Sequence, residues 1–435
     1  MGESVSEGRT TKGIASLYEA AIALMAERKY RNAKEILGPL VPAVGDPDPA
    51  FVAALGRCHW ELQEWEDALR LCDRATQANP ADVDSMHTAG RALKKLGRLA
   101  EALDRFAVLT RLFPDHTEGW NMYGACLRES GRFDESVAAY EVYLSRNPKA
   151  VEATNAYVMA LAKAGQTDKA RAAGQRLLEM KHENAMAFFA KEVDHPQLAP
   201  ATKVFNPHRP KRNVICFSLW GQQPAYVTGA IVNARIGPLI YPGWTCRFYC
   251  DPDVPADALE QLRLAEAQVV MMPGPELARL KNMWRFFASD DPEVDFFLCR
   301  DTDSRLNVKE AIAVQAWLRS GKPFHVIRDN LFHMELMLAG MWGGMAGVLP
   351  NQRKMISEKT KSGFYHFGDQ AYLARHVWPL IHDRVEQHDK FYAFNGGAPL
   401  ACSYELAPWQ HIGGSIKTNV PHWSTISYPI DDSNS

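Results

Sequence analysis

The chain has 435 residues, of which 46% are hydrophobic and 23% are charged. This length allows two or three domains, and the composition is that of a globular protein, which excludes wholesale disorder. A formal charge of −2 argues against a general nucleic-acid binder, and no apolar run in the sequence approaches the roughly 18 residues of a membrane span.

The N-terminal residues 1–13 form a polar tail without the apolar core of a signal peptide. Eight cysteines are scattered along the chain without C-x-x-C pairs, so we interpret them as small buried hydrophobes. We therefore expect a protein of the reducing cytoplasm.

Residues 14–190 repeat with a period of 34. The recurring positions are Pro80, Pro114 and Pro148, Gly56, Gly90 and Gly124, and Ala68, Ala102 and Ser136. The small residues let two helices approach each other closely, and each proline ends the second helix of its unit. This is the tetratricopeptide pattern, a helix–turn–helix of 34 residues. With two weaker units, 14–47 and 151–182, we count five repeats.

Stacked repeats form a superhelix with a concave surface that commonly binds proteins or peptides. We expect such a partner on the concave face. The sequence leaves open whether that partner is another protein or a second copy of the same chain, which would make a homo-oligomer.

The helical period is lost in a linker, residues 191–212, where four X-Pro pairs exclude a continuing helix. The predicted strands beyond it are 213–219, 245–250, 268–272, 294–299 and 324–327, and the predicted helices are 223–237, 256–267, 283–289 and 308–320. This alternation predicts one Rossmann-like α/β domain over residues 213–425, with a mostly parallel sheet and helices on both faces. A polar tail, residues 426–435, follows.

The predicted strand 294–299 leads into two carboxylates, Asp301 and Asp303. Strand tips are where open α/β sheets bind ligands, and two hard oxygen ligands suit Mg²⁺ or Mn²⁺, which can hold a diphosphate. The alternative is a solvated loop whose acidic residues merely end the strand. Two arginines, Arg300 and Arg305, flank the pair, and they either neutralise the acids or contact a substrate.

Three further segments carry residues of the same chemistry. Arg285 lies on the predicted helix before the acidic pair, from which its guanidinium could reach a phosphate. The glycines of residues 338–344 allow close approach of the backbone to a ligand. Asp369 and Gln370 begin a helix, although N-capping by Asp369 is a sufficient explanation for that position.

Near the C-terminus, His411 could complete a metal site begun by two carboxylates. Gly414 lets backbone amides face a phosphate, and Lys417 can neutralise its charge. A solvated polar tail is the alternative for this segment.

In this order the residues resemble A-type-fold glycosyltransferases, most closely the retaining family that includes glycogenin and bacterial lipopolysaccharide galactosyltransferases. The positions that carry the likeness are Arg285, Asp301 and Asp303, Ala339-Gly340, Asp369-Gln370, and His411, Gly414 and Lys417. The chain departs from the family at Leu338, where the family has asparagine, and after Lys417, where a Pro-Trp pair is absent.

The resemblance implies a metal-dependent enzyme that moves a hexosyl group from a nucleotide sugar to an acceptor recruited by the repeats. It implies Asp301, Asp303 and His411 as ligands of Mn²⁺ or Mg²⁺, with His388 as a rival third ligand. The catalytic residues that it implies are Asp329, Asp369 and Gln370. The substrate-binding residues that it implies are Phe217, Ser218, Asp251, Arg285, Gly340, Trp342, Gly414 and Lys417.

Two other functions compete with this hypothesis. The first is a repeat-based interaction scaffold whose glycosyltransferase-like domain is catalytically degenerate. The second is a phosphatase-like hydrolase with Asp301 as nucleophile, which Arg305 disfavours because that family has Thr or Val at this position. The sequence leaves open the donor sugar and base, the acceptor, and whether the anomeric configuration is retained or inverted.

Overall fold

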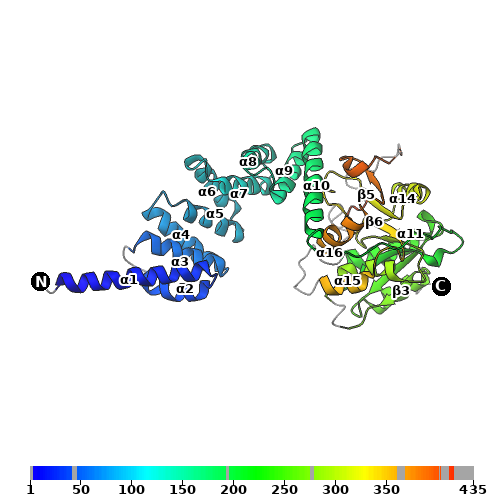
Figure 1. Cartoon of the computed structure of the whole chain (residues 1–435), viewed down its shortest axis with the longest axis horizontal. Coiled ribbons are helices and arrows are strands. Elements are labelled where there is room, and N and C mark those ends of the chain that lie inside the picture. The colour runs from blue at the N-terminus through cyan, green and yellow to red at the C-terminus, as the bar shows by residue number, and fades with distance from the viewer. Residues whose placement is uncertain are drawn as a thin grey trace, which may run out of the picture. The chain divides into compact units, whose positions relative to one another are not determined.

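The structure, a computed structural model, describes residues 3–41, 47–192, 195–274, 279–359, 368–400, 402 and 411–415. The chain divides into two compact units, Met1–Ala170 and Arg171–Ser435, which Figure 1 shows as a helical array and a unit built on a sheet. Of the helices in the described ranges, none combines the length and the apolar character needed to cross a bilayer.

The first unit consists of helix–turn–helix pairs. Its helices are α1 (Glu3–Ala26), α2 (Tyr30–Leu37), η1 (Gly38–Leu40), α3 (Pro49–Glu61), α4 (Trp65–Ala78), α5 (Val83–Lys95), α6 (Leu99–Leu112), α7 (Thr117–Glu129), α8 (Phe133–Arg146) and α9 (Val151–Lys163), and α10 (Thr167–Phe189) begins in it and continues into the second unit. The pairs α3–α4, α5–α6 and α7–α8 each occupy one 34-residue repeat of the sequence.

Two of the recurring glycines, Gly90 and Gly124, mark places where a ring of the partner helix approaches the backbone. A Cβ atom at Gly90 would lie 2.7 Å from Cζ of Phe106, and one at Gly124 would lie 3.1 Å from the ring of Tyr140. The repeat starts are also encoded locally, because the Asp82 side chain accepts a hydrogen bond from the Ser85 amide and caps α5.

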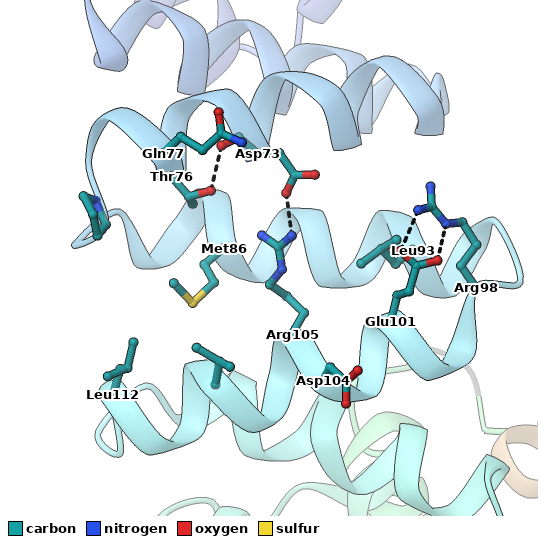
Figure 2. A pocket seen from close by; sticks show the side chains of 12 residues that line it. Asp73, Thr76, Gln77, Met86, Leu93, Arg98, Glu101, Asp104, Arg105 and Leu112 are labelled. Carbon is teal, nitrogen blue, oxygen red and sulfur yellow. Dashed lines mark hydrogen bonds and ion pairs between the residues drawn. The ribbon is translucent and has the colours of Figure 1, made fainter.

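The array curves toward its first helices. The first helices of neighbouring pairs (α3, α5, α7 and α9) contact one another directly, whereas the described second helices α4, α6 and α8 stand further apart. An ion pair bridges α4 and α6 on the more open side: Arg105 Nη2 lies 2.7 Å from Asp73 Oδ1 (Figure 2).

The second unit is built on a seven-stranded mixed sheet with the order β3-β2-β1-β4-β6-β5-β7. Its strands are β1 (Asn213–Leu219), β2 (Thr245–Cys250), β3 (Gln268–Met271), β4 (Phe296–Cys299), β5 (Phe324–Arg328), β6 (Trp342–Met345) and β7 (Val385–Asp389). Within this sheet β6 is antiparallel to β4 and β5, and the other strand pairs are parallel.

The five strands expected from the sequence are present, but β6 and β7 were not predicted. Two glycines of β6, which disfavour a strand prediction, are required by the packing. A Cβ atom at Gly343 would lie 2.5 Å from the carbonyl oxygen of Phe297, and one at Gly344 would lie 2.6 Å from the ring of Phe324.

The helices of this unit are, besides most of α10, η2 (Pro210–Arg212), α11 (Pro224–Ile240), α12 (Ala256–Leu264), η3 (Lys281–Asp290), α14 (Val308–Ser320), α15 (Gln352–Lys359), α16 (Gly368–Tyr372), the π-helical η4 (Leu373–Val377), α17 (Trp378–Ile381) and η5 (Phe394–Gly396). The predicted helix 283–289 is the 3-10 helix η3, which packs on β1 and β4.

Most of α10 belongs to the second compact unit, which begins at Arg171, before the predicted linker 191–212. Lys181 Nζ donates hydrogen bonds to the Met334 carbonyl, at 2.7 Å, and to Glu335. The Trp378 indole donates to His182 Nδ1 at 2.9 Å.

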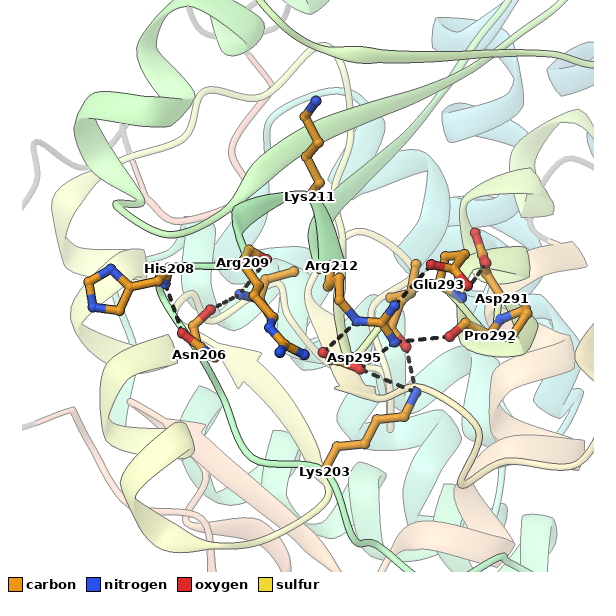
Figure 3. Close-up of polar contacts among 12 residues, drawn as sticks. Lys203, Asn206, His208, Arg209, Lys211, Arg212, Asp291, Pro292, Glu293 and Asp295 are labelled. Atoms are coloured by element: carbon orange, nitrogen blue, oxygen red, sulfur yellow. Dashed lines mark hydrogen bonds and ion pairs between the residues drawn. The ribbon is translucent and has the colours of Figure 1, made fainter.

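The predicted linker is itself held against the sheet (Figure 3). Arg212 donates two hydrogen bonds to the Asp295 carboxylate, at 2.8 and 2.9 Å. Lys203 Nζ donates to the carbonyl of Val294. The residues before β1 are therefore anchored to the segment that enters β4.

Candidate functional site

The candidate site lies where the strand order of the sheet reverses. The strands β1 and β4 are neighbours, while β2 and β3 continue on the far side of β1. Such a reversal leaves a crevice outside the carboxyl ends of the strands, where ligands of open α/β sheets bind. Asp251, Asp301 and Asp329 follow the ends of β2, β4 and β5, which point the same way, so all three lie along this edge.

A cavity of about 310 Å³ opens beside Asp301. Its lining residues are Arg285, Asp301, His333, Leu338, Ala339, Gly340, Met341, Asp369, Gln370 and Gly413. These residues come from η3, the loop after β4, the segment between β5 and β6, the start of α16, and the segment 411–415. The structure thus brings together five of the residues singled out in the sequence: Arg285, Asp301, Gly340, Asp369 and Gln370.

Arg285 connects the two acidic residues of the cavity. Its Nη1 donates to Asp301 Oδ1 and, at 3.2 Å, to the carbonyl of Arg300, and its Nη2 lies 3.2 Å from Asp369 Oδ2. The Arg285 side chain is 6% exposed and that of Asp301 is 42% exposed. Burial disfavours the guanidinium charge, but Asp301 and Asp369 raise the pKa of Arg285 above its ordinary value.

Asp369 is the more buried of the two carboxylates. Burial raises its pKa above the ordinary value, and Arg285 opposes that rise. The carboxylate also accepts a hydrogen bond from the amide of Gln370 at 2.9 Å. Asp369 is therefore bound both to the start of α16 and to Arg285.

The loop that carries the acidic pair is held by α11, a role that sequence reasoning missed. Asn233, fully buried, donates to the Ser304 carbonyl at 2.9 Å and accepts from the Leu306 amide at 3.2 Å. Gly229 faces the backbone of Thr302, whose carbonyl carbon would be 3.0 Å from a Cβ atom. The sequence signal was weak, because a small residue and an amide are ordinary on a helix packed against a sheet.

The segment 411–415 lies across the same edge. The Ile412 amide donates to Asp329 Oδ2 at 3.3 Å, and Ser415 Oγ donates to Asp303 Oδ2 at 2.8 Å. The Gly414 amide donates to the carbonyl of His411 within a turn, and the phosphate-facing role of this segment stays a prediction. Lys417 lies outside the described residues.

His333 lines the cavity and was not predicted, because a lone histidine carries no sequence signal. The Asp329 amide donates to its Nδ1 at 3.0 Å, and the ring of His411 lies 5.2 Å away, centroid to centroid. Burial, with the nearby His411, lowers the pKa of His333 to about 3. His333 is therefore neutral at physiological pH.

The three predicted metal ligands are not assembled as a site. Within the described ranges, no three side chains of His, Cys, Asp or Glu group together as metal ligands. Asp301 is bonded to Arg285 and Asp303 to Ser415. The assignment of Asp301, Asp303 and His411 to a metal ion remains a prediction.

The rival ligand His388 has a different environment. It lies on β7, where its Nδ1 is 2.9 Å from Nε2 of His325 on β5. The segment of His411, in contrast, contacts Asp303 directly through Ser415. Of the two histidines, His411 is thus the one whose segment reaches the acidic pair.

Two of the residues expected to bind substrate are core residues instead. Phe217 is fully buried and stacks on Phe248, with ring centroids 4.8 Å apart. Trp342 is fully buried as well, and its ring packs edge-on against Phe286 and Phe297. Both rings point into the packing of the sheet, so the structure gives neither one a surface for a ligand.

Other predicted residues are engaged in contacts that position the site. Ser218 Oγ accepts from the backbone amide of Arg285 at 3.1 Å and so fixes η3 at the end of β1. Asp251 lies 2.8 Å from Lys281 Nζ. Asp329 is nearly buried and lies 3.1 Å from Lys309 Nζ.

The arginines beside the acidic pair differ in where they point. Arg300 is buried and points into the fold, where it pairs with Glu310 and donates to the carbonyls of Cys299 and Trp342. Arg305 donates to backbone carbonyls of its own loop. The countercharge of Asp301 is instead Arg285, from a different segment.

Comparisons with known proteins concern the N-terminal region. The tetratricopeptide repeat family model matches residues 18–83, 87–149 and 127–185, so this region is built of tetratricopeptide repeats. Two solved structures with similarity are MamA of AMB-1, at 17% identity, with a TM-score of 0.36 and coverage of 38% of this chain and 98% of that one, and MamA 41-end from Desulfovibrio magneticus RS-1, at 11% identity, with a TM-score of 0.35 and coverage of 39% and 96%. No curated protein matches the chain.

Proposed function

We propose that this chain is a protein-interaction scaffold whose tetratricopeptide repeats bind a protein partner. The observation that carries the proposal is the match of the repeat family over residues 18–185. Stacked helix pairs offer a long surface of side chains, and such surfaces typically serve recognition of other proteins.

Affinity capture of partners by the full chain, with three matched variants, tests this proposal. Gly90→Leu forces a side chain into the ring of Phe106 and disrupts the repeats. Asp301→Ala and Asp303→Ala remove the acidic pair. We expect partners to be lost with the first variant and kept with the other two. Partners that depend on the acidic pair and not on the repeats would contradict the proposal.

The second unit supports a further candidate function, transfer of a sugar from a nucleotide sugar. The specific observation is the convergence of Arg285, Asp301, Asp369 and Gln370 on one cavity at the tips of the strands. The partial strand order β3-β2-β1-β4 also matches the first four positions of the strand order in dinucleotide-binding sheets. These features agree with a site for a diphosphate and a sugar.

In this candidate function Asp301 and Asp303 would hold Mn²⁺ or Mg²⁺. Such ions are commonly bound by one or two carboxylates together with substrate phosphates, so two carboxylates at a strand tip fit the ion chemically. When bound, the ion supplies a Lewis acid for the departing diphosphate. Arg285 adds a fixed positive charge beside the same position, and Asp369 and Gln370 offer polar groups to a sugar.

Calorimetric titration with a panel of nucleotide sugars, with and without Mn²⁺, tests this second candidate. Binding that needs Mn²⁺ and disappears in the Asp301→Ala/Asp303→Ala variant is the expected result, followed by release of the free sugar or its transfer. If the chain binds none of the donors in the presence of Mn²⁺, the sugar-transfer function is rejected and the scaffold function is left.

A further inference from the structure

Two neighbouring hollows lie in the repeat array and share one exposed leucine. The first has a volume of about 450 Å³ and lies between α4 and α6 over part of α5 (Figure 2). The second has a volume of about 590 Å³ and lies at the turns that precede α5 and follow α6. Leu112, the last residue of α6, lines both of them and is 54% exposed.

The first hollow has an apolar floor and a polar rim. Met86 and Leu93 of α5 are nearly buried beneath it, and Val108 and Leu112 lie one helical turn apart on α6. The Asp73–Arg105 ion pair connects the two helices that flank this hollow, α4 and α6. An apolar side chain from another molecule could pack here against carbon atoms of three helices, α4, α5 and α6.

The charges around the two hollows are mainly negative. Six carboxylates line them, against two guanidiniums. Both guanidiniums already face carboxylates of the rim, since Arg98 pairs with Glu101 and Arg105 with Asp73. The lining of the second hollow has Asp82, Asp84 and Asp115 and no lysine or arginine, and Arg146, from outside the lining, pairs with Asp115 at 3.2 Å. A ligand with positive charge is therefore complementary to this surface.

The hollows do not lie on the concave face, which is the surface expected from the sequence to bind the partner. The first helices of the repeats face the inner side of the curve, whereas the first hollow opens between two second helices. The second helices stand further apart than the first ones, and this spacing is what leaves room between α4 and α6. Repeat curvature thus creates a groove on the outer side.

We infer that the groove between α4 and α6, with the adjoining hollow at the following turns, binds a basic protein segment that carries an exposed apolar side chain. The apolar side chain packs on Leu112, Met86 and Val108, and flanking Lys or Arg residues face the carboxylates. This inference rests on the proposed scaffold function and names the chemistry of its partner. It differs from a concave-face site in both place and charge.

A peptide library tests the inference with the full chain. The probe is an immobilised set of short peptides with a central Leu, Phe or Ala, flanked by Lys and Arg, by Asp and Glu, or by Ser. We expect enrichment of peptides that combine a large apolar centre with basic flanks, and weaker binding at high salt because exposed charges are screened. Enrichment of acidic or uncharged peptides, or of none, overturns the inference.

A pair of matched variants then locates the binding. Leu112→Glu places a charge in the groove, and Leu264→Glu makes the same change at the last residue of α12, where the leucine is 64% exposed. We expect at least about a tenfold loss of affinity for the enriched peptides with Leu112→Glu and none with Leu264→Glu. Unchanged circular dichroism checks the fold of both.

Charge-reversal variants distinguish rejection of the proposed groove from rejection of the proposed scaffold function. Asp84→Lys with Asp104→Lys should weaken binding of the basic peptides and favour their acidic counterparts. If partner proteins still bind the repeats while Leu112→Glu and the charge reversal have no effect, the scaffold function stands and the groove is rejected. If the full chain binds neither proteins nor peptides, both are rejected.

Discussion

The backbone of Gly340 lies directly against the carboxylate of Asp301, so that a Cβ atom at position 340 would be 2.6 Å from Cγ of Asp301. This contact explains why a glycine precedes β6, since any side chain would displace the acidic residue at the tip of β4. It also links two segments that close the cavity.

Gly340→Ala should move Asp301 out of its contact with Arg285. We expect faster amide hydrogen exchange in residues 300–306, because the loop loses its anchor, and a loss of about 1–3 kcal/mol in the free energy of unfolding from overpacking. Gly38→Ala is the control, since a Cβ atom there meets nothing within 4 Å. Unchanged exchange in 300–306 would show that the loop accommodates the methyl group.

Arg285→Gln should destabilise the second unit because it leaves Asp369 buried opposite Asp301 without a countercharge. Loss of one partner of a buried ion pair typically costs about 3 kcal/mol or more in the free energy of unfolding. The double variant Arg285→Gln/Asp369→Asn should recover part of this loss, because it removes the buried charge. Chemical denaturation of both variants and of Asp369→Asn alone measures the effect, and strictly additive losses would contradict the pairing.

Lys181→Met should loosen the segment between β5 and β6 that carries His333 and Leu338. Lys181, 15% exposed at its side chain, donates to the Met334 carbonyl and to Glu335, and loss of such charged hydrogen bonds costs about 2 kcal/mol. Hydrogen exchange of residues 331–338 is the measurement.

The control for this prediction lies on the same helix. Lys169 is 63% exposed and lies 3.7 Å from Glu141, and such surface pairs contribute little. Lys169→Met should leave the exchange of residues 331–338 unchanged. Equal effects of the two substitutions would mean that α10 does not hold this segment through Lys181.

The repeat array should lose stability in mild acid through His87. Burial, with His116 and Arg91 nearby, lowers the pKa of His87 to about 4. The folded pKa lies below that of the unfolded chain, about 6.5, so this stability is full above about pH 6.5 and is lost as the pH falls toward 4, at up to about 1.4 kcal/mol per pH unit.

His87→Gln should therefore reduce the difference between the urea midpoints of unfolding at about pH 7 and about pH 5. Circular dichroism measures both midpoints. The exposed His208 provides the control, and His208→Gln should leave that dependence as it is in the natural chain. A wild-type midpoint that stays constant over this range would contradict the role of His87.

Most of the sheet could be predicted from local sequence, while the cavity could be predicted only as a set of separate residues. The apolar runs at 213–219, 245–250 and 296–299 are strands because both of their faces are covered, and such runs are visible in the sequence. The strand β6 was not predicted because the need for glycine at its positions comes from close contact with residues of β4 and β5. Those residues lie far away in the chain.

The sequence by itself determined the repeat array, because the two helices of each 34-residue unit approach each other at small residues in the same positions, so this packing appears in the sequence as a period. It also determined that acidic residues end the strands. Only the tertiary structure decided which charges face each other. Arg300, beside Asp301 in the chain, turns into the core to meet Glu310, and Arg285 meets Asp301 instead. Neighbouring side chains at a strand end point to opposite faces, so contact at the site depends on which distant segment the fold brings there.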